Sequence, residues 1–138
     1  MVGTVTVPTE IVAQRLRDAD DFFRVGKEEI RQGTEDSDDM RTRQGFEKLF
    51  HALLNAYVAR VYVYREFYFY PASHKALLEG LEIAELRGEA TFYGEMLEIF
   101  HNRLYHQGET NLFGLAKLYV GRIELEIATA RDWIAEVS

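Results

Sequence analysis

The chain has 138 residues, of which 47% are apolar and 28% charged, a composition typical of one soluble globular domain. A domain of this length buries roughly two-thirds of its unfolded surface, so it needs no disulfide or metal to hold a core. The absence of cysteine excludes disulfide frameworks, thiolate zinc sites, cysteine nucleophiles and iron–sulfur clusters. A net charge of −7 argues against a surface that coats nucleic-acid phosphates.

The N-terminal residues show no basic segment ahead of an apolar stretch, and no apolar run approaches the ~20 residues of a membrane span. We therefore expect a cytoplasmic protein without a membrane partner. Apolar residues recur at intervals of three and four along most of the chain, which predicts helix throughout. The predicted fold is all-α, an up-and-down antiparallel bundle of about five helices, four long and one short. We assign residues 1–138 to a single domain, with an extended segment at residues 1–7.

The first helix is expected to start at Pro8, run to about Gln32 and end at Gly33. The acidic connection that follows contains Asp36, Asp38 and Asp39. Metal binding is one interpretation of these acids, but acids ahead of a helix also suit capping and the helix dipole, which we favour. The residues expected to face the core are Ile11, Leu16, Ala19, Phe22, Phe23 and Ile30.

The second helix is expected from about Asp39 to the late sixties, with small residues that allow another helix to approach closely. Its end, residues 62–70, is rich in tyrosine and phenylalanine, and these side chains cannot all face one core. A subunit contact or plain core packing is the favoured interpretation. Stacking on nucleic-acid bases is the alternative, weakened because only Arg65 supplies positive charge in the run. The run could also form a strand. The inward and small residues of this helix are Phe46, Phe50, Leu53, Leu54, Tyr57, Val58 and Val61, with Ala52, Ala56 and Ala59.

Three further helices are expected, over residues 74–86, 91–107 and from 110 or 111 to 135. Ser73 is expected to cap the first of them, and Gly108 to end the second. The residues of the last helix expected to face the core are Leu112, Leu115, Ala116, Tyr119, Ile123, Ile127, Ala130 and Ile134.

The helix over 91–107 carries the candidate chemistry. At about 100° per residue, His101 falls on one border of its apolar stripe, and Asn102, Arg103 and His106 fall near the other. Polar residues at the edge of a core stripe, just before a glycine, are well placed to reach a cleft. They would equally suit a helix C-terminus, where His and Arg complement the dipole. His51 and His74 also have explanations without a function. His51 would be a histidine of the core or of an interface, and His74 an ordinary residue at a helix start.

Three segments together resemble a known family. Residues 43–54 resemble the second-helix pattern of HEPN-type domains, which are small helical bundles associated with RNA or nucleotides, including archaeal relatives of the PaREP1 type. Residues 73–78 resemble that family's short third helix. Residues 101–106 fall where the family carries an arginine, a polar residue such as asparagine, and a histidine. The resemblance covers most of the chain as a pattern of apolar spacing.

The resemblance implies a metal-independent ribonuclease that works as a homodimer, with no cofactor. His106 would be the general acid or base near the 2′-hydroxyl, and Asn102 would orient the site. The position of the leading arginine is His101 here, and Arg103 is the neighbouring substitute. A neutral histidine stabilises a phosphorane-like transition state poorly. We therefore expect binding of RNA or nucleotide in preference to cleavage, with a partner protein as a further possibility.

Two other classes of function remain open. Glu98 and His101 have the E-x-x-H spacing of carboxylate-bridged di-iron bundles, and Glu47 and His51 offer a partial counterpart. Iron or manganese would be the metal of such a site. A non-catalytic helical protein-interaction module is the third hypothesis. The glutamates that could complete a di-iron site, by residue type alone, are Glu28, Glu29, Glu124 and Glu126.

Overall fold

The computed structural model describes residues 9–64 and 71–137, and within these ranges every regular element is a helix. The prediction of an all-α protein is confirmed. No helix in these ranges is both long and apolar enough to cross a bilayer. The helices number more than the five expected, because two predicted helices are interrupted. In chain order they are α1 (Thr9–Glu35), α2 (Asp39–Tyr64), α3 (His74–Ile83), α4 (Arg87–Met96), the π-helix η1 (Leu97–His106), the 3₁₀ turn η2 (Thr110–Leu112), α5 (Phe113–Lys117) and α6 (Val120–Val137).

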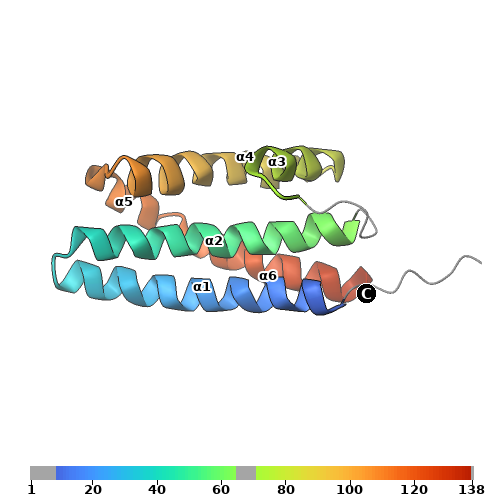
Figure 1. The fold of residues 1–138 in the computed structure, drawn as a ribbon, viewed down its shortest axis with the longest axis horizontal. Helices are drawn as coiled ribbons and strands as arrows, with labels where there is room; N and C mark the ends of the chain where they lie inside the picture. The colour runs from blue at the N-terminus through green and yellow to red at the C-terminus, as the bar shows by residue number, and fades with distance from the viewer. Residues whose placement is uncertain (1–8, 65–70, 138) are drawn as a thin grey trace, which may run out of the picture.

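Helices α1 and α2 form a hairpin whose two backbones touch (Figure 1). A Cβ on Gly45 would lie 2.7 Å from the carbonyl oxygen of Gly26, and a Cβ on Gly33 would lie 2.4 Å from Thr42 Oγ1. Gly33 was expected to end α1, and this was wrong, because Gly33 serves the contact between helices and lies inside α1. The chain turns instead at Ser37, whose φ is +53°.

The acidic connection between the two helices serves as a cap. Asp38 Oδ1 accepts a hydrogen bond of 3.1 Å from the backbone N–H of Arg41, in the first turn of α2. This satisfies a backbone donor that a helix start would otherwise leave unpaired. The favoured interpretation of these acids therefore has a direct structural counterpart.

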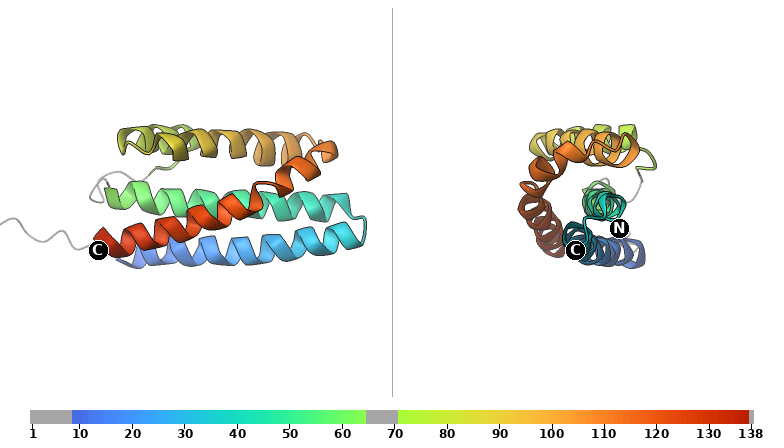
Figure 2. Two further views of the ribbon diagram at one scale, coloured as in Figure 1. Left: turned by 180° about the vertical axis from the view of Figure 1, so that it is seen from behind. Right: turned by 90° about the vertical axis from the view of Figure 1, so that its left-hand side faces the viewer.

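Helix α2 lies at the centre of the molecule. It contacts α1, α3, α4, η1 and α6, and the view along the molecule shows these helices around it (Figure 2). It is therefore buried around most of its circumference, and almost every position from Gly45 to Val63 is buried. Ala52, Ala56 and Ala59 are buried as expected, but the closest contacts come from the glycines. Its buried polar residues are Thr42, Glu47, Asn55 and Arg60.

Helices α3, α4 and η1 form a layer on one side of α2 (Figure 1). The helix expected over 74–86 ends at Ile83, and the chain turns at Glu85, whose φ is +61°. The helix expected over 91–107 starts earlier, at Arg87, and changes at Leu97 from α to π geometry. This change places the candidate residues on η1 and alters which of them lie together.

The single helix expected from residue 110 to 135 is broken into η2, α5 and α6. The bonds from Leu118 N to Leu115 O and from Tyr119 N to Ala116 O span three residues, so α5 closes in a tight turn. The chain then changes direction, and α6 runs back past α2 and α1 (Figure 2). Leu115 is 39% exposed as a result, and Ile11 at the start of α1 is 42% exposed, so both were wrongly assigned to the core.

The aromatic run lies mostly outside the described residues. Helix α2 is described to Tyr64, which is 43% exposed, and Tyr62 is buried. Residues 65–70 and the predicted extended segment at 1–7 lie outside the described ranges. A dimer contact at the aromatic run stays a prediction.

Candidate functional site: a histidine cluster around Glu47

The four histidines of the chain lie together at Glu47 of α2 and the neighbouring Phe50. Glu47 is only 7% exposed. Its Oε1 atom is 2.6 Å from Nδ1 of His101 on η1 and 3.0 Å from Nε2 of His51, one turn further along α2. One carboxyl oxygen therefore serves two imidazoles that come from different helices. Its second oxygen, Oε2, is buried and has no hydrogen-bond partner among the residues that the structure describes.

The π-helix joins His106 to this group. His106 Nε2 lies 3.1 Å from His101 Nε2, and the two rings meet edge to face with centroids 4.4 Å apart. A π-helix bonds residues five apart, so residues 101 and 106 stand one above the other. On the α-helix expected from the sequence, these two histidines would lie on opposite borders of the apolar stripe. The structure thus replaces that arrangement with a pair of histidines in contact.

Arg43 fixes the end of η1 against α2. Its Nε atom donates to the carbonyl oxygen of Leu104 at 2.9 Å, and its Nη2 atom donates to the carbonyl oxygen of Tyr105. These carbonyls belong to the last turn of η1, where helix geometry leaves carbonyl groups without internal partners. Arg43 lies one helical turn before Glu47 on α2. The same face of α2 therefore holds both the backbone of η1 and its His101 side chain.

Phe50 provides an apolar platform for the cluster. Its ring is stacked on that of His101, with centroids 5.4 Å apart and planes inclined by 24°. It also contacts the rings of His51 and His74, each at 5.9 Å. Phe50 is fully buried, so one wall of the site is dry and the polar contacts within it are strengthened.

His74, at the start of α3, extends the cluster. Its Nδ1 atom is 2.6 Å from the hydroxyl of the buried Tyr93, and its ring centroid is 5.5 Å from that of His101. Burial lowers the pKa of His74, and the neighbouring His101 and His51 lower it further. Burial and the nearby Glu47 raise the pKa of Tyr93, so this hydroxyl keeps its proton at neutral pH.

The contacts define a relay for protons. When Nδ1–H of a neutral His101 donates to Glu47, the Nε2 atom of His101 carries a lone pair and accepts from Nε2–H of His106. A carboxylate bound to one imidazole nitrogen orients the ring and fixes which nitrogen carries the proton. The arrangement can therefore take a proton at His101 and give one from His106.

The other two residues of the predicted motif turn elsewhere. Asn102 Nδ2 donates to Glu98 Oε2 at 3.3 Å. Arg103 makes a fork to Glu109, with bonds of 3.0 and 2.9 Å, and this pair holds the loop after η1. The structure therefore brings His101 and His106 together, whereas Asn102 and Arg103 each bind a nearby glutamate.

The di-iron alternative finds only part of its ligand set together. Glu47, His51 and His101 meet, but their contacts are made to one another, and Glu98 is exposed beside Asn102. Among the described residues, no group of three or more histidine or acidic side chains could hold a metal ion. The four glutamates proposed by type are also engaged elsewhere, Glu28 with Arg31, Glu29 with Lys48, Glu124 with Lys27 and Glu126 with Tyr57.

Sequence reasoning missed Arg43, His74 and Tyr93 as members of this site. Arg43, Glu47 and His51 are spaced four apart, and this polar stripe on an otherwise apolar helix was the available signal. His74 was interpreted as an ordinary helix start. Nothing local to His74 or Tyr93 distinguishes them, because their contact joins two separate helices.

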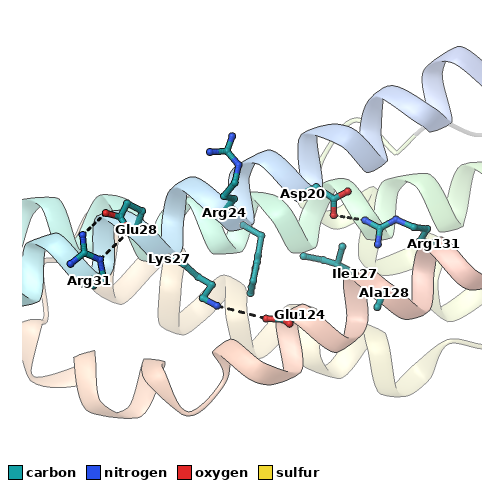
Figure 3. Close-up of a pocket in the computed structure, with 10 residues that line it drawn as sticks. Asp20, Arg24, Lys27, Glu28, Arg31, Glu124, Ile127, Ala128 and Arg131 are labelled. Carbon is teal, nitrogen blue, oxygen red and sulfur yellow. Dashed lines mark hydrogen bonds and ion pairs between the residues drawn. The ribbon is translucent and has the colours of Figure 1, made fainter.

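A hollow of about 930 Å³, lined by other residues than the histidine cluster, lies between α1 and α6 (Figure 3). Its charged side chains are paired across or along the groove, Arg131 with Asp20, Lys27 with Glu124, and Arg31 with Glu28. These pairs are exposed to solvent, so each contributes little to stability. We therefore place the candidate site at the histidine cluster.

No protein-family model, curated protein or solved structure matches this chain.

Proposed function

We propose that the chain is a HEPN-like domain that binds RNA or nucleotide at the histidine cluster, as a homodimer, and cleaves RNA there without a metal ion. The observation that carries this proposal is the continuous array from Glu47 Oε1 through both nitrogens of His101 to Nε2 of His106. A carboxylate-oriented histidine next to a second histidine is suited to acid–base catalysis. The resemblance of residues 43–54 and 101–106 to HEPN domains supplies the substrate class.

In this proposal the RNA backbone enters between the two Nε2 atoms and replaces their hydrogen bond. His101, oriented by Glu47, takes the proton of the 2′-hydroxyl as that oxygen attacks the adjacent phosphorus atom. His106, protonated, gives its proton to the 5′-oxygen as the bond from phosphorus to that oxygen breaks. The products are a 2′,3′-cyclic phosphate and a free 5′-hydroxyl. The cation that offsets the developing charge on the phosphate is His106 itself, because Arg103 is held by Glu109.

The test is cleavage of labelled single-stranded RNA in EDTA. We expect His101→Ala and His106→Ala each to lower the rate by about 100-fold or more, the range of general acid–base catalysis. Gln107→Ala is the matched control, because Gln107 is exposed and directly follows His106. Equal rates in all four proteins would assign the cleavage to a contaminant, and no cleavage by the wild type would overturn the catalytic part of the proposal.

A protein-interaction module is the second candidate, and a different surface favours it. Leu118 is 78% exposed and Leu125 is 62% exposed, where α5 and α6 meet. A contiguous exposed apolar patch is typical of a surface that a partner covers, and these two leucines would form part of one. Replacing both with serine would abolish association with a partner and leave RNA cleavage unchanged if the two functions are separate.

A further inference from the structure

A cavity of about 440 Å³ adjoins the histidine cluster on the side of α3. Its walls include three aliphatic side chains, Leu54 and Val58 of α2 and Leu77 of α3, together with the ring of Tyr93. Val58, Leu77 and Tyr93 are buried. The cavity is within the size range of small-molecule sites, and apolar walls with a few polar groups at one edge are typical of them.

The polar edge of this cavity is the start of α3. Ser73 and His74 line it, and Ser73 Oγ is already used as the helix cap, accepting from the backbone N–H of Ala76 at 3.0 Å. Arg15 of α1 also lines it and is held by Asn55, with Nη1 2.8 Å from Asn55 Oδ1. His74 is therefore the side chain best placed to give the cavity specificity.

The contact with Tyr93 determines which nitrogen of His74 carries the proton. The Tyr93 side chain is fully buried, and the acceptor that the structure gives its hydroxyl among the described residues is His74 Nδ1. A buried hydroxyl proton needs an acceptor, so Tyr93 donates to Nδ1. The proton of the neutral imidazole then lies on Nε2. His74, which lines the cavity, thus carries an N–H donor at Nε2.

The cavity is next to the proposed reaction centre. The ring of His74 is 5.5 Å from that of His101, and both rings contact Phe50. Within one nucleotide, the base and the phosphate lie on opposite sides of a single ribose. One nucleotide can therefore place its phosphate at His101 and His106 and its base beyond His74.

We propose that this cavity is a base pocket, in which a nucleobase lies against Leu54, Val58 and Leu77 and accepts a hydrogen bond from His74 Nε2–H. The inference rests on the proposed function, since it names the part of an RNA substrate that the structure would recognise beside the acid–base pair. A flat ring with carbonyl or ring-nitrogen acceptors matches both the apolar walls and the single donor. The pocket would make the protein bind a ligand that carries a base more tightly than one without a base.

The experiment is calorimetric titration of the protein with adenosine and uridine 3′-monophosphates and with ribose 5-phosphate, a probe without a base. We expect at least one nucleotide to bind tenfold or more tightly than ribose 5-phosphate. Leu54→Phe, which fills the cavity, should weaken nucleotide binding at least tenfold. Ile83→Phe is the matched control, because Ile83 is exposed at the far end of α3 and does not line the cavity, and this change should leave binding unaltered. Equal affinities for the three probes, absence of binding, or unchanged binding by a folded Leu54→Phe would overturn the pocket.

Two further measurements separate this inference from the proposed cleavage. Nucleotide binding should shift the methyl NMR signals of Val58 and Leu77 in the wild-type protein, which needs no cavity variant to fold; unmoved signals would overturn the pocket. His106→Ala should lose RNA cleavage and keep selectivity for the nucleotide over ribose 5-phosphate. If the wild type binds nucleotides as described but does not cleave RNA, the cleavage fails and the pocket stands. If it cleaves RNA but binds the nucleotides no more tightly than ribose 5-phosphate, the pocket fails alone.

Discussion

The groove between α1 and α6 and the histidine cluster around Glu47 both gather charged side chains from distant parts of the chain, but in opposite surroundings. In the groove, the side chains of Arg31 and Glu28 are 54% and 51% exposed. A hydrogen bond from Arg31 lowers the pKa of Glu28 to about 2, yet solvent screens the pair. In the cluster, the side chain of Glu47 is only 10% exposed. Four basic residues line the groove, whereas the cluster has few charges. Burial against Phe50, and not the number of charges, distinguishes the functional candidate.

The largest expected effect breaks the scaffold that both regions share. Gly45→Ala would push a Cβ to 2.7 Å from the Gly26 carbonyl oxygen, so α1 and α2 must separate. Overpacking of this kind costs about 1–3 kcal/mol of unfolding free energy. Gly94→Ala is the matched control in α4, because a Cβ there meets no atom within 4 Å, and it should raise stability by about 0.5 kcal/mol or more. Urea denaturation of both variants checks the difference, and equal costs would contradict the account of this contact.

The next effect concerns both stability and activity. Glu47→Met replaces the buried carboxyl group with an apolar side chain of similar volume. Within residues 9–64 and 71–137, Oε2 of that carboxyl group has no hydrogen-bond partner. Removing one partner of a buried pair is destabilising, here by about 1–2 kcal/mol, because His101 Nδ1 loses its acceptor. RNA cleavage should be lost because His101 is no longer oriented. Glu28→Met in the groove should leave cleavage unchanged. Urea denaturation and the RNA assay measure both properties, and loss of stability with retained cleavage would make Glu47 a structural residue only.

A smaller effect appears in the pH dependence of stability. Burial lowers the pKa of His74 below its ordinary value of 6.5. Between the two pKa values, the His74 side chain is therefore protonated in the unfolded chain and neutral in the folded protein. Unfolding free energy should therefore fall as the pH drops below about 6.5, until the folded pKa is passed. His74→Gln keeps an acceptor for Tyr93 but cannot titrate, so it should flatten this part of the profile. Denaturation midpoints from pH 7.5 to 5 test this, and an unchanged slope would contradict it.

The general fold followed from the sequence, but the geometry of the site did not. Apolar spacing of three and four identifies helix, yet it does not distinguish α from π geometry in residues 97–106. The π geometry of this segment occurs together with contacts from α2. Arg43 donates to the carbonyl oxygens of Leu104 and Tyr105, and Glu47 contacts His101. Gly33 failed as a stop signal because a glycine that ends a helix and one that admits a neighbouring helix look alike in sequence. The histidines were individually visible, whereas their meeting depended on tertiary structure.

The most direct test determines whether RNA binds at the histidine cluster or in the groove between α1 and α6. Labelled protein can be titrated with a single-stranded 2′-O-methyl oligonucleotide, which resists cleavage through the 2′-hydroxyl, while NMR follows the histidine imidazole signals and the side-chain signals of Arg24, Lys27 and Arg131. Our account predicts that the signals of His101, His106 and His74 shift together and saturate at one RNA concentration. Shifts confined to Arg24, Lys27 and Arg131 in the α1–α6 groove, with the histidine signals unmoved, would contradict it.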